Sequence, residues 1–527
     1  MFPSLIHTEA NETTDRYNEG QVLLIIVLSL MKKIFLLFAM SLCTLSAYAL
    51  DLPEIIGSNM MLQQQTNAKL WGWAKGGSTV NVTTSWNNQS YSAKADKETG
   101  RWEIKVQTPA ASYETYSITV KGDGQTKTID NVLIGEVWFC SGQSNMEISL
   151  GGFWNCPIEG SNEAIANSGK YKKAIRFATI PKADALVPQD KVAGKWEICE
   201  PQNAQRFSAV GYFFARTLTD LLDVPVGIIN CSWGGSCVEG WLPKEILETY
   251  PDGLTPIDDT DYHRKMVMYN GMLHPLMGYT IKGFLWNQGE SNVGYEKEYF
   301  ERFQTMAKLW RTGWNQPGDK LPFYTVEIPG YRYGNDENGI DAAKFREVQH
   351  KIAHSLENSG CVCTSDLVYE WEKDQIHATK KLEIGQRLAY MAATRDYGMS
   401  GFWAENPEFE KMEVVEANEW DKAVIAGTPV AANPNDKGKV TLLYFTNAFD
   451  GFDRMQDIEG FEAAGDDGIF HPAIVWSSNN DTRPLLKMVC PEVPEIKYVR
   501  YCFKNFVVGK LHNSRQLPIV PFRTDNF

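Results

Sequence analysis

Three polar stretches of this chain lie where an expected strand ends or an expected helix begins. The first contains Ser144 and directly follows an apolar run, residues 137–139, which is typical of the end of a buried strand. The other two are Gln288-Gly289-Glu290-Ser291-Asn292 and Asp374-Gln375-Ile376-His377. Because α/β sheets place active sites at the carboxyl ends of their strands, we predict that the three stretches meet and form a serine esterase site.

A serine hydroxyl needs a base to take its proton, and histidine is the side chain best suited to this near neutral pH. His377 stands three residues after Asp374. An aspartate at this spacing can hold the imidazole Nδ1–H and leave Nε2 toward the serine. We therefore predict Ser144 as nucleophile, His377 as base and Asp374 as orienting acid. The alternative is a helix cap followed by a surface histidine.

His274 is the rival base. No acid lies within the five residues before it, so we expect it to be structural or to line the substrate site. Three further histidines, His350, His354 and His471, are expected at surface positions of helices or strands.

Ester hydrolysis passes through an oxyanion that needs preorganised N–H donors, and the loss of one donor typically costs about 3 kcal/mol. The candidates are the Ser144 backbone, the pair Gly234-Gly235 and the amide of Gln288. A double glycine lets the backbone approach a ligand closely, although it is equally common in an ordinary turn. This chemistry requires no metal or other cofactor, and no cysteine spacing resembles a zinc site.

The elements that position these stretches alternate between strands and helices. We expect strands at 135–140, 224–231, 281–287, 321–328 and 361–367, and helices at 211–222, 295–314, 342–356 and 380–397. Such alternation predicts a parallel sheet covered on both faces. Residues 131–400 are therefore predicted to form an α/β catalytic domain.

Segments of β character flank this domain. Residues 50–130 contain five short runs rich in β-branched and aromatic residues, separated by Gly and Asn turns, which predicts a β-sandwich of immunoglobulin-like size. Residues 401–527 return to β character. This tail either forms a further β-domain or packs with the N-terminal sandwich.

Length and charge limit the class of protein. A chain of 527 residues is too long for one ordinary core, so more than one domain is expected. The net charge of −14 argues against a nucleic-acid partner, because phosphate binding needs a basic face. Nine of the ten cysteines follow Ala49, so at least one stays unpaired in an oxidising compartment.

The start of the chain has the features of a secretory signal. Met31-Lys32-Lys33 is basic, residues 34–45 are apolar, and Ala47-Tyr48-Ala49 resembles a cleavage site. We expect cleavage after Ala49, with residues 1–30 an upstream extension. The mature protein is then expected to be secreted or periplasmic, without stable membrane insertion.

The polar stretches, together with Gly234-Gly235-Ser236 and Trp286-Asn287, resemble the sequence blocks of the SGNH (GDSL-like) hydrolases. The greatest similarity is to the sialate O-acetylesterase group of carbohydrate acetylesterases, from about Leu52 to the end. The resemblance implies an SGNH-type α/β/α core, an acetyl-serine intermediate and an O-acetylated sugar substrate. It also implies an oxyanion hole of Ser144, Gly235 and Gln288. The chain departs from the family at Asn287, where an aromatic residue is frequent.

Six further residues in or near these motifs are expected to contact the substrate: Gln143, Asn145, Trp241, Asn270, Glu290 and Arg346. The loops 151–157, 238–243 and 331–338 are expected to set specificity. The residues leave three alternatives open: an esterase for xylan or another glycan, a non-catalytic carbohydrate-binding protein, and a peptidase, which is disfavoured because no motif suggests a peptide groove. Against the second, a chemically competent residue fills every catalytic position.

Overall fold

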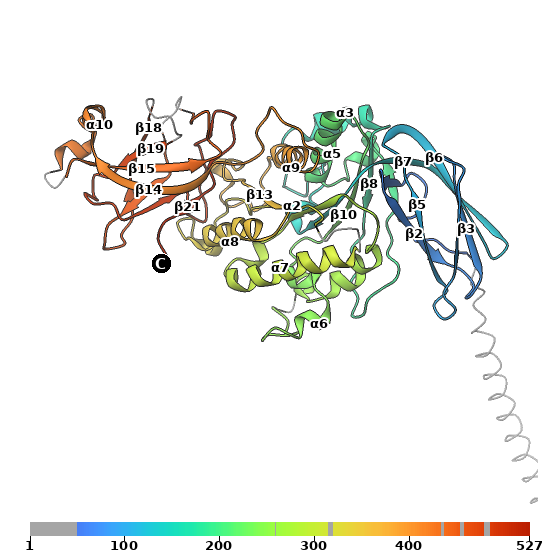
Figure 1. The fold of residues 1–527 in the computed structure, drawn as a ribbon. Helices are drawn as coiled ribbons and strands as arrows, with labels where there is room; N and C mark the ends of the chain where they lie inside the picture. Colours follow the sequence, from blue (N-terminus) through green and yellow to red (C-terminus); the bar gives the residue numbers. More distant parts are fainter. Residues whose placement is uncertain (1–49, 259, 315–319, 434–436, 454–457, 479–484) are drawn as a thin grey trace, which may run out of the picture.

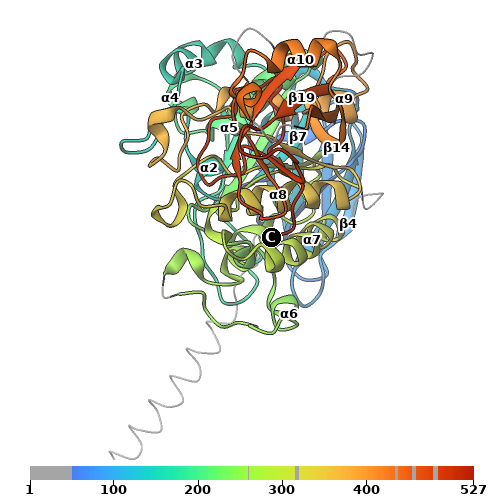
Figure 2. The ribbon, with the colours of Figure 1, turned by 90° about the vertical axis from the view of Figure 1, so that its left-hand side faces the viewer.

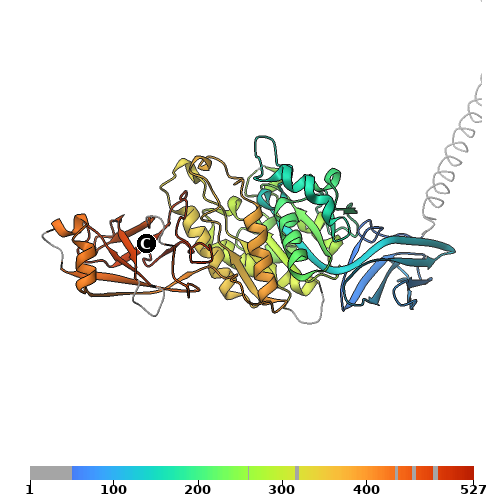
Figure 3. The ribbon, with the colours of Figure 1, turned by 90° about the horizontal axis from the view of Figure 1, so that it is seen from above.

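The computed structural model describes residues 50–258, 260–314, 320–433, 437–453, 458–478 and 485–527. The predicted upstream extension and signal peptide lie outside these residues. An N-terminal β-domain, a central α/β domain and a C-terminal β-domain follow one another along the molecule (Figures 1 and 3). None of the described helices is both long and apolar enough to span a bilayer.

The N-terminal domain consists of the β-strands β1 (Met61–Gln63), β2 (Asn67–Trp73), β3 (Thr79–Thr84), β4 (Ser90–Lys94), β5 (Arg101–Gln107) and β6 (Ser112–Gly122). They pair antiparallel except for β1, whose partner strand runs parallel to it. β2 pairs with β5, and β3 pairs with β4 and β6. Burial alternates along β5, because successive side chains of a strand point to opposite faces.

One long strand, β7 (Gln125–Gly142), joins the N-terminal and central domains. Its first part pairs with β6 and its last part pairs with β10 and β11 of the central sheet. The predicted boundary between residues 130 and 131 therefore falls inside a strand. From residue 132 onward every residue of β7 is buried, which is the pattern of a strand covered on both faces.

The central sheet has the order β13-β12-β11-β7-β10-β8-β9. The strands are β8 (Ile175–Thr179), β9 (Trp196–Ile198), β10 (Val226–Ser232), β11 (Gly283–Asn287), β12 (Phe323–Val326) and β13 (Ser359–Val362). All pairs except β8–β9 are parallel. The predicted parallel sheet is confirmed, whereas β8 and β9 were not expected from the sequence.

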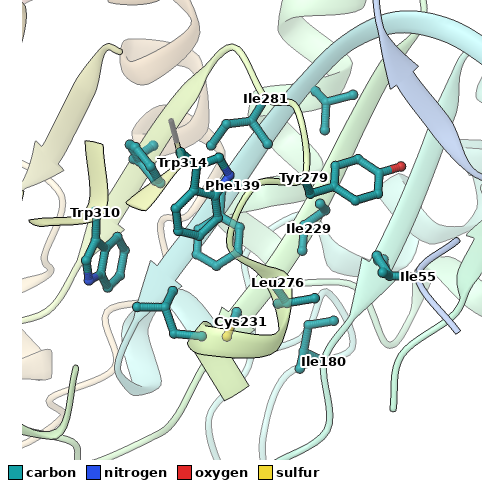
Figure 4. Close-up of a cluster of buried hydrophobic side chains, with 14 of the residues drawn as sticks. Ile55, Phe139, Ile180, Ile229, Cys231, Leu276, Tyr279, Ile281, Trp310 and Trp314 are labelled. Carbon is teal, nitrogen blue, oxygen red and sulfur yellow. The ribbon is translucent and has the colours of Figure 1, made fainter. Parts of the chain in front are cut away.

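Helices cover both faces of this sheet, which also confirms the prediction. α5 (Ala209–Leu222) and α9 (Leu382–Arg395) lie on one side, and α7 (Glu296–Gly313) and α8 (Asp341–Ser355) on the other (Figures 1 and 2). A hydrophobic core lies on each face of the sheet, and neighbouring residues of β7 contribute to different cores. Trp138 packs toward α5, and Phe139 packs against Trp310 and Trp314 (Figure 4). Shorter helices are α2 (Ser144–Glu147), α3 (Ser161–Asn167), α4 (Pro201–Ala204) and α6 (Lys244–Leu247).

The C-terminal domain lies at the opposite end of the central domain from the N-terminal strands (Figure 1). One sheet holds β14 (Glu408–Glu416), β15 (Lys439–Thr446), β19 (Leu485–Val489) and β18 (Ile474–Ser477). The other holds β17 (His471–Pro472), β16 (Phe461–Ala464), β20 (Tyr498–Tyr501) and β21 (Phe522–Arg523). α10 (Glu419–Ile425) follows β14. Of the two expected arrangements, the tail thus forms a separate β-domain.

Candidate active site

Ser144 lies at a tight turn between β7 and α2. A Cβ at Gly142, whose φ is +138°, would lie 2.1 Å from the carbonyl oxygen of Asn287, so only glycine fits there. The backbone N–H of Gln143 donates to that same carbonyl at 3.0 Å. The turn therefore presents Ser144 at the carboxyl end of the central strand, where the sequence predicts the nucleophile.

Hydrogen bonds join the three predicted stretches at this rim. Asn145 Nδ2 donates to the carbonyl oxygen of Ile376 at 3.1 Å, which ties the residue after Ser144 to the residue before His377. The side-chain oxygen of Gln143 accepts from the N–H of Gly289 at 3.1 Å. The predicted convergence of the three stretches is confirmed.

The imidazole of His377 lies in a partly buried, largely apolar setting. The Phe153 ring meets it edge-on with 5.6 Å between ring centroids, and Cys156 Sγ lies 3.6 Å from Nδ1. Burial, and to a smaller extent the nearby Lys381 cation, together lower the pKa of His377 to about 4. The imidazole is therefore neutral, the form that a general base needs, at neutral pH.

Asp374 takes a different partner from the one that the sequence suggests. Its Oδ1 pairs with the Arg332 guanidinium at 2.7 Å, and 56% of its side chain is exposed. Within the described part of the chain no hydrogen bond joins Asp374 to His377, whose Nδ1 instead faces the Cys156 thiol. This arrangement does not show Asp374 orienting the imidazole, so that role stays a prediction.

A buried polar network lies behind the nucleophile. Asn145 Nδ2 donates to Glu290 Oε1 at 2.5 Å, and Lys381 Nζ donates to Asn145 Oδ1 at 2.6 Å. Burial raises the pKa of Glu290 and lowers that of Lys381 to about 8. These bonds fix the amide of Asn145 and hence the turn that carries Ser144. Sequence reasoning missed Lys381, Cys156 and Arg332, because no motif includes them.

Two backbone N–H groups are available for an oxyanion. In the described residues neither the Ser144 N–H nor the Gly235 N–H donates a hydrogen bond. Gly234, the residue before Gly235, lies against the nucleophile, because a Cβ placed on Gly234 would lie 3.4 Å from Ser144 Cβ. Gly235 has φ +80°, a conformation that favours glycine. This geometry fits the Ser144 and Gly235 donors that the sequence suggests.

The side-chain amide of Gln288 already donates two hydrogen bonds within the protein. Its Nε2 donates to the Ser236 carbonyl at 3.0 Å and to Asn292 Oδ1 at 2.8 Å, so both amide N–H groups are used. The amide thus holds the turn next to Gly235, and it could donate to an oxyanion only after one of these bonds breaks. Its predicted role in the oxyanion hole stays a prediction.

The residues expected to contact substrate are all buried: Gln143, Asn145, Trp241, Asn270, Glu290 and Arg346. Trp241 donates to Ser236 Oγ at 3.0 Å, and Asn270 donates to the Ala185 carbonyl at 3.1 Å. Arg346 donates to the Lys504 carbonyl. The structure therefore gives each of them an internal contact, and substrate contact stays a prediction.

The histidines outside the site differ from expectation in one case. His350 is buried and its Nε2 lies 2.7 Å from Glu327 Oε2, although a surface position was expected, because helix α8 turns this side toward the sheet. His274 Nδ1 lies 2.8 Å from the Gln189 carbonyl, a structural contact. The nine described cysteines are all free thiols.

Comparisons with known proteins find acetylesterases among the relatives of this chain. Residues 134–394 match the family described as carbohydrate esterase, sialic acid-specific acetylesterase. The chain is 27% identical over 390 residues to the Homo sapiens sialate O-acetylesterase, covering 68% of this chain and 73% of that protein. It is 25% identical over 416 residues to the Mus musculus sialate O-acetylesterase, covering 69% and 76%.

A solved structure extends the likeness to the flanking domains. The crystal structure of a carbohydrate acetylesterase from Xanthomonas citri has a TM-score of 0.77 and 28% identity to this chain, and the match covers 91% of this chain and 100% of that one. Fold and site together define an SGNH-like carbohydrate ester hydrolase with added β-domains. The central domain matches the carbohydrate esterase family of sialic acid-specific acetylesterases, and the chain as a whole is similar to sialate O-acetylesterases and to a carbohydrate acetylesterase of solved structure.

Proposed function

We propose that this protein is a serine esterase that removes O-acetyl groups from sialic acid through an acetyl-serine on Ser144. The observation that supports this most is the convergence of the Ser144 turn and the His377 loop beside two unpaired backbone N–H groups. We propose O-acetylated sialic acid as the substrate because the chain is similar to sialate O-acetylesterases.

The proposed reaction has two steps. Ser144 Oγ attacks the acetyl carbonyl carbon while His377 Nε2 takes the hydroxyl proton, and the N–H groups of Ser144 and Gly235 stabilise the oxyanion. The ester C–O bond breaks, and the sugar hydroxyl leaves with the proton from His377. Water, deprotonated by His377, then attacks the acetyl-serine and releases acetate and free Ser144.

Two measurements test this function. An organophosphate probe should label Ser144 in the wild-type protein, with no labelling of a Ser144→Ala variant. Wild-type protein should also release acetate from O-acetylated sialic acid. A protein that is neither labelled at Ser144 nor able to release acetate from any acetylated sugar would support the non-catalytic alternative instead.

Another acetylated glycan is the second candidate substrate. The Xanthomonas citri relative, whose structure matches 91% of this chain, is described as a carbohydrate acetylesterase without a named sugar. Acetylated xylan, tested beside O-acetylated sialic acid at equal acetyl concentration, separates the two. A higher kcat/KM for xylan would reassign the substrate while leaving the serine mechanism in place.

We also propose that the protein acts outside the cytoplasm, secreted or periplasmic. The support is the signal-like sequence from Met31 to Ala49. N-terminal sequencing of the mature protein should find Leu50 as the first residue, and a mature protein that retains Met31 would contradict this proposal.

A further inference from the structure

Two exposed tryptophans stand on the loops that contact the catalytic imidazole. Trp154 is 90% exposed and Trp371 is 76% exposed. A tryptophan left in water forgoes the large stabilisation that burying its ring would bring, so such exposure indicates a surface for binding. The third tryptophan exposed to a similar degree in the described residues, Trp420 at 56%, lies far away in the C-terminal domain.

Trp154 is fixed close to the base by its neighbours. Phe153 and Cys156 exchange two backbone hydrogen bonds, of 3.1 and 3.0 Å, and so close a tight turn with Trp154 at its tip. Both of these residues contact His377, through the Phe153 ring and the Cys156 thiol. Trp154 is therefore exposed to solvent on the turn whose first and last residues contact the imidazole.

Trp371 is the outermost of three stacked side chains on the neighbouring loop. Its ring lies on the Tyr369 ring at 4.4 Å between centroids, with an angle of 7°. Lys380 Nζ lies 4.2 Å from the centre of the Tyr369 ring and must take the opposite face, because Trp371 occupies the first. The outer face of Trp371 is thus held in place and open to solvent.

Contacts join the two loops to each other. The Tyr369 hydroxyl donates to Glu159 Oε2 at 2.8 Å, and the Glu159 N–H donates to the Thr379 carbonyl at 3.0 Å. Gln375 Nε2 donates to Cys156 Sγ at 3.5 Å. The tryptophans consequently stand on one supported rim around His377 rather than on independent loops.

We infer that Trp154 and Trp371 form a platform on which sugar rings of an oligosaccharide stack, so that the acetyl group of one ring reaches Ser144. This inference rests on the proposed function. The apolar C–H face of a pyranose ring matches the negative face of an indole, and an exposed, rigidly held ring binds it with little loss of side-chain freedom. The substrate class is therefore an acetylated oligosaccharide rather than a free acetylated monosaccharide.

The test compares large and small substrates. For Trp154→Ala and Trp371→Ala we expect kcat/KM on an O-acetylated sialyl-oligosaccharide to fall about 3- to 10-fold each, mainly through KM, since an aromatic contact of about 0.5–1.5 kcal/mol is lost. kcat/KM on p-nitrophenyl acetate should stay within about twofold. Phenylalanine at either position should restore most of the loss, because it keeps an aromatic face.

Trp420→Ala is the matched control, since it removes another exposed indole, in the C-terminal domain, and should leave kcat/KM unchanged on both substrates. An acetylated xylo-oligosaccharide is run in parallel as the other glycan source. Unchanged kcat/KM on both oligosaccharides in both variants overturns the platform while leaving the esterase function standing.

Binding provides a readout that does not depend on turnover. Calorimetry of the Ser144→Ala protein with the same two oligosaccharides should give a measurable Kd, weakened when Trp154→Ala is added. Absence of binding to both oligosaccharides overturns the platform. Wild-type protein that binds them but releases no acetate contradicts the proposed function alone.

Discussion

The low pKa of His377 predicts where activity is lost in acid. A general base acts only when it is unprotonated, and kcat/KM reports the protonation of the free enzyme. Since the pKa of His377 is lowered to about 4, kcat/KM should stay level from neutral pH downward and fall only near pH 4. The perturbation that tests the cause is Lys381→Met, which removes the buried ammonium group.

The size of the effect follows from the order of the two causes. The pKa of His377 moves from 6.5 to about 4, with burial the larger cause and the Lys381 cation the smaller. Lys381 is charged throughout this range, because its own pKa is about 8. Removing a positive charge makes protonation of the imidazole easier, so Lys381→Met should raise the midpoint of the acid limb by about one pH unit or less.

The assay is acetate release from p-nitrophenyl acetate, measured from about pH 3 to about pH 8 to give kcat/KM at each pH. Full activity after return to neutral pH separates titration from acid unfolding. Lys380→Met is the matched control: it removes the same charge one residue away, where the side chain lies over the Tyr369 ring instead of against Asn145. It should leave the midpoint in place.

Two results would refute this reasoning. An acid limb of the wild-type protein near pH 6–7 would mean that a carboxylate such as Asp374 holds Nδ1 in solution, because a neighbouring negative charge raises the pKa of an imidazole. A midpoint that Lys381→Met does not move would mean that its charge does not act on His377. A uniform loss of kcat/KM at every pH would reflect only the lost hydrogen bond to Asn145.

Four other substitutions test the remaining parts of the site. Ser144→Ala should lower kcat by several orders of magnitude, and near-normal turnover would remove the nucleophile assignment. His377→Ala should be far more harmful to kcat than His274→Ala, and the reverse ranking would make His274 the base. Gly235→Ala should lower kcat about tenfold or more with a modest effect on Tm, because its Cβ would lie 2.7 Å from the Tyr262 ring and disturb an oxyanion donor. Unchanged kcat would exclude that donor.

Local patterns in the sequence predicted most of the central fold. The apolar run that ends at Gly142 and the helical spacing near 342–356 each depend on residues close in the chain, so burial and element type could be read directly. β8 and β9 escaped prediction. β8 has only five residues, and β9 has three residues that become a strand only through pairing with β8.

The boundary between the N-terminal and central domains could be predicted from the sequence only in part. Residues before and after 130 differ in pattern, since burial alternates along the first part of β7 and is continuous in the second. The sequence therefore indicates a change of environment correctly. Only the pairing partners reveal that one unbroken strand passes through both environments.

The sequence by itself predicted the candidate reacting groups: a serine after a glycine turn, a histidine on a later loop, and a glycine pair as a source of backbone donors. Tertiary structure alone decided the partners. Asp374 pairs with Arg332, Cys156 faces the imidazole, and Lys381 reaches Asn145 across 236 residues of chain. The physical reason is that a strand or turn forms from neighbouring residues, whereas the pKa and orientation of His377 depend on charges and surfaces that only folding brings together.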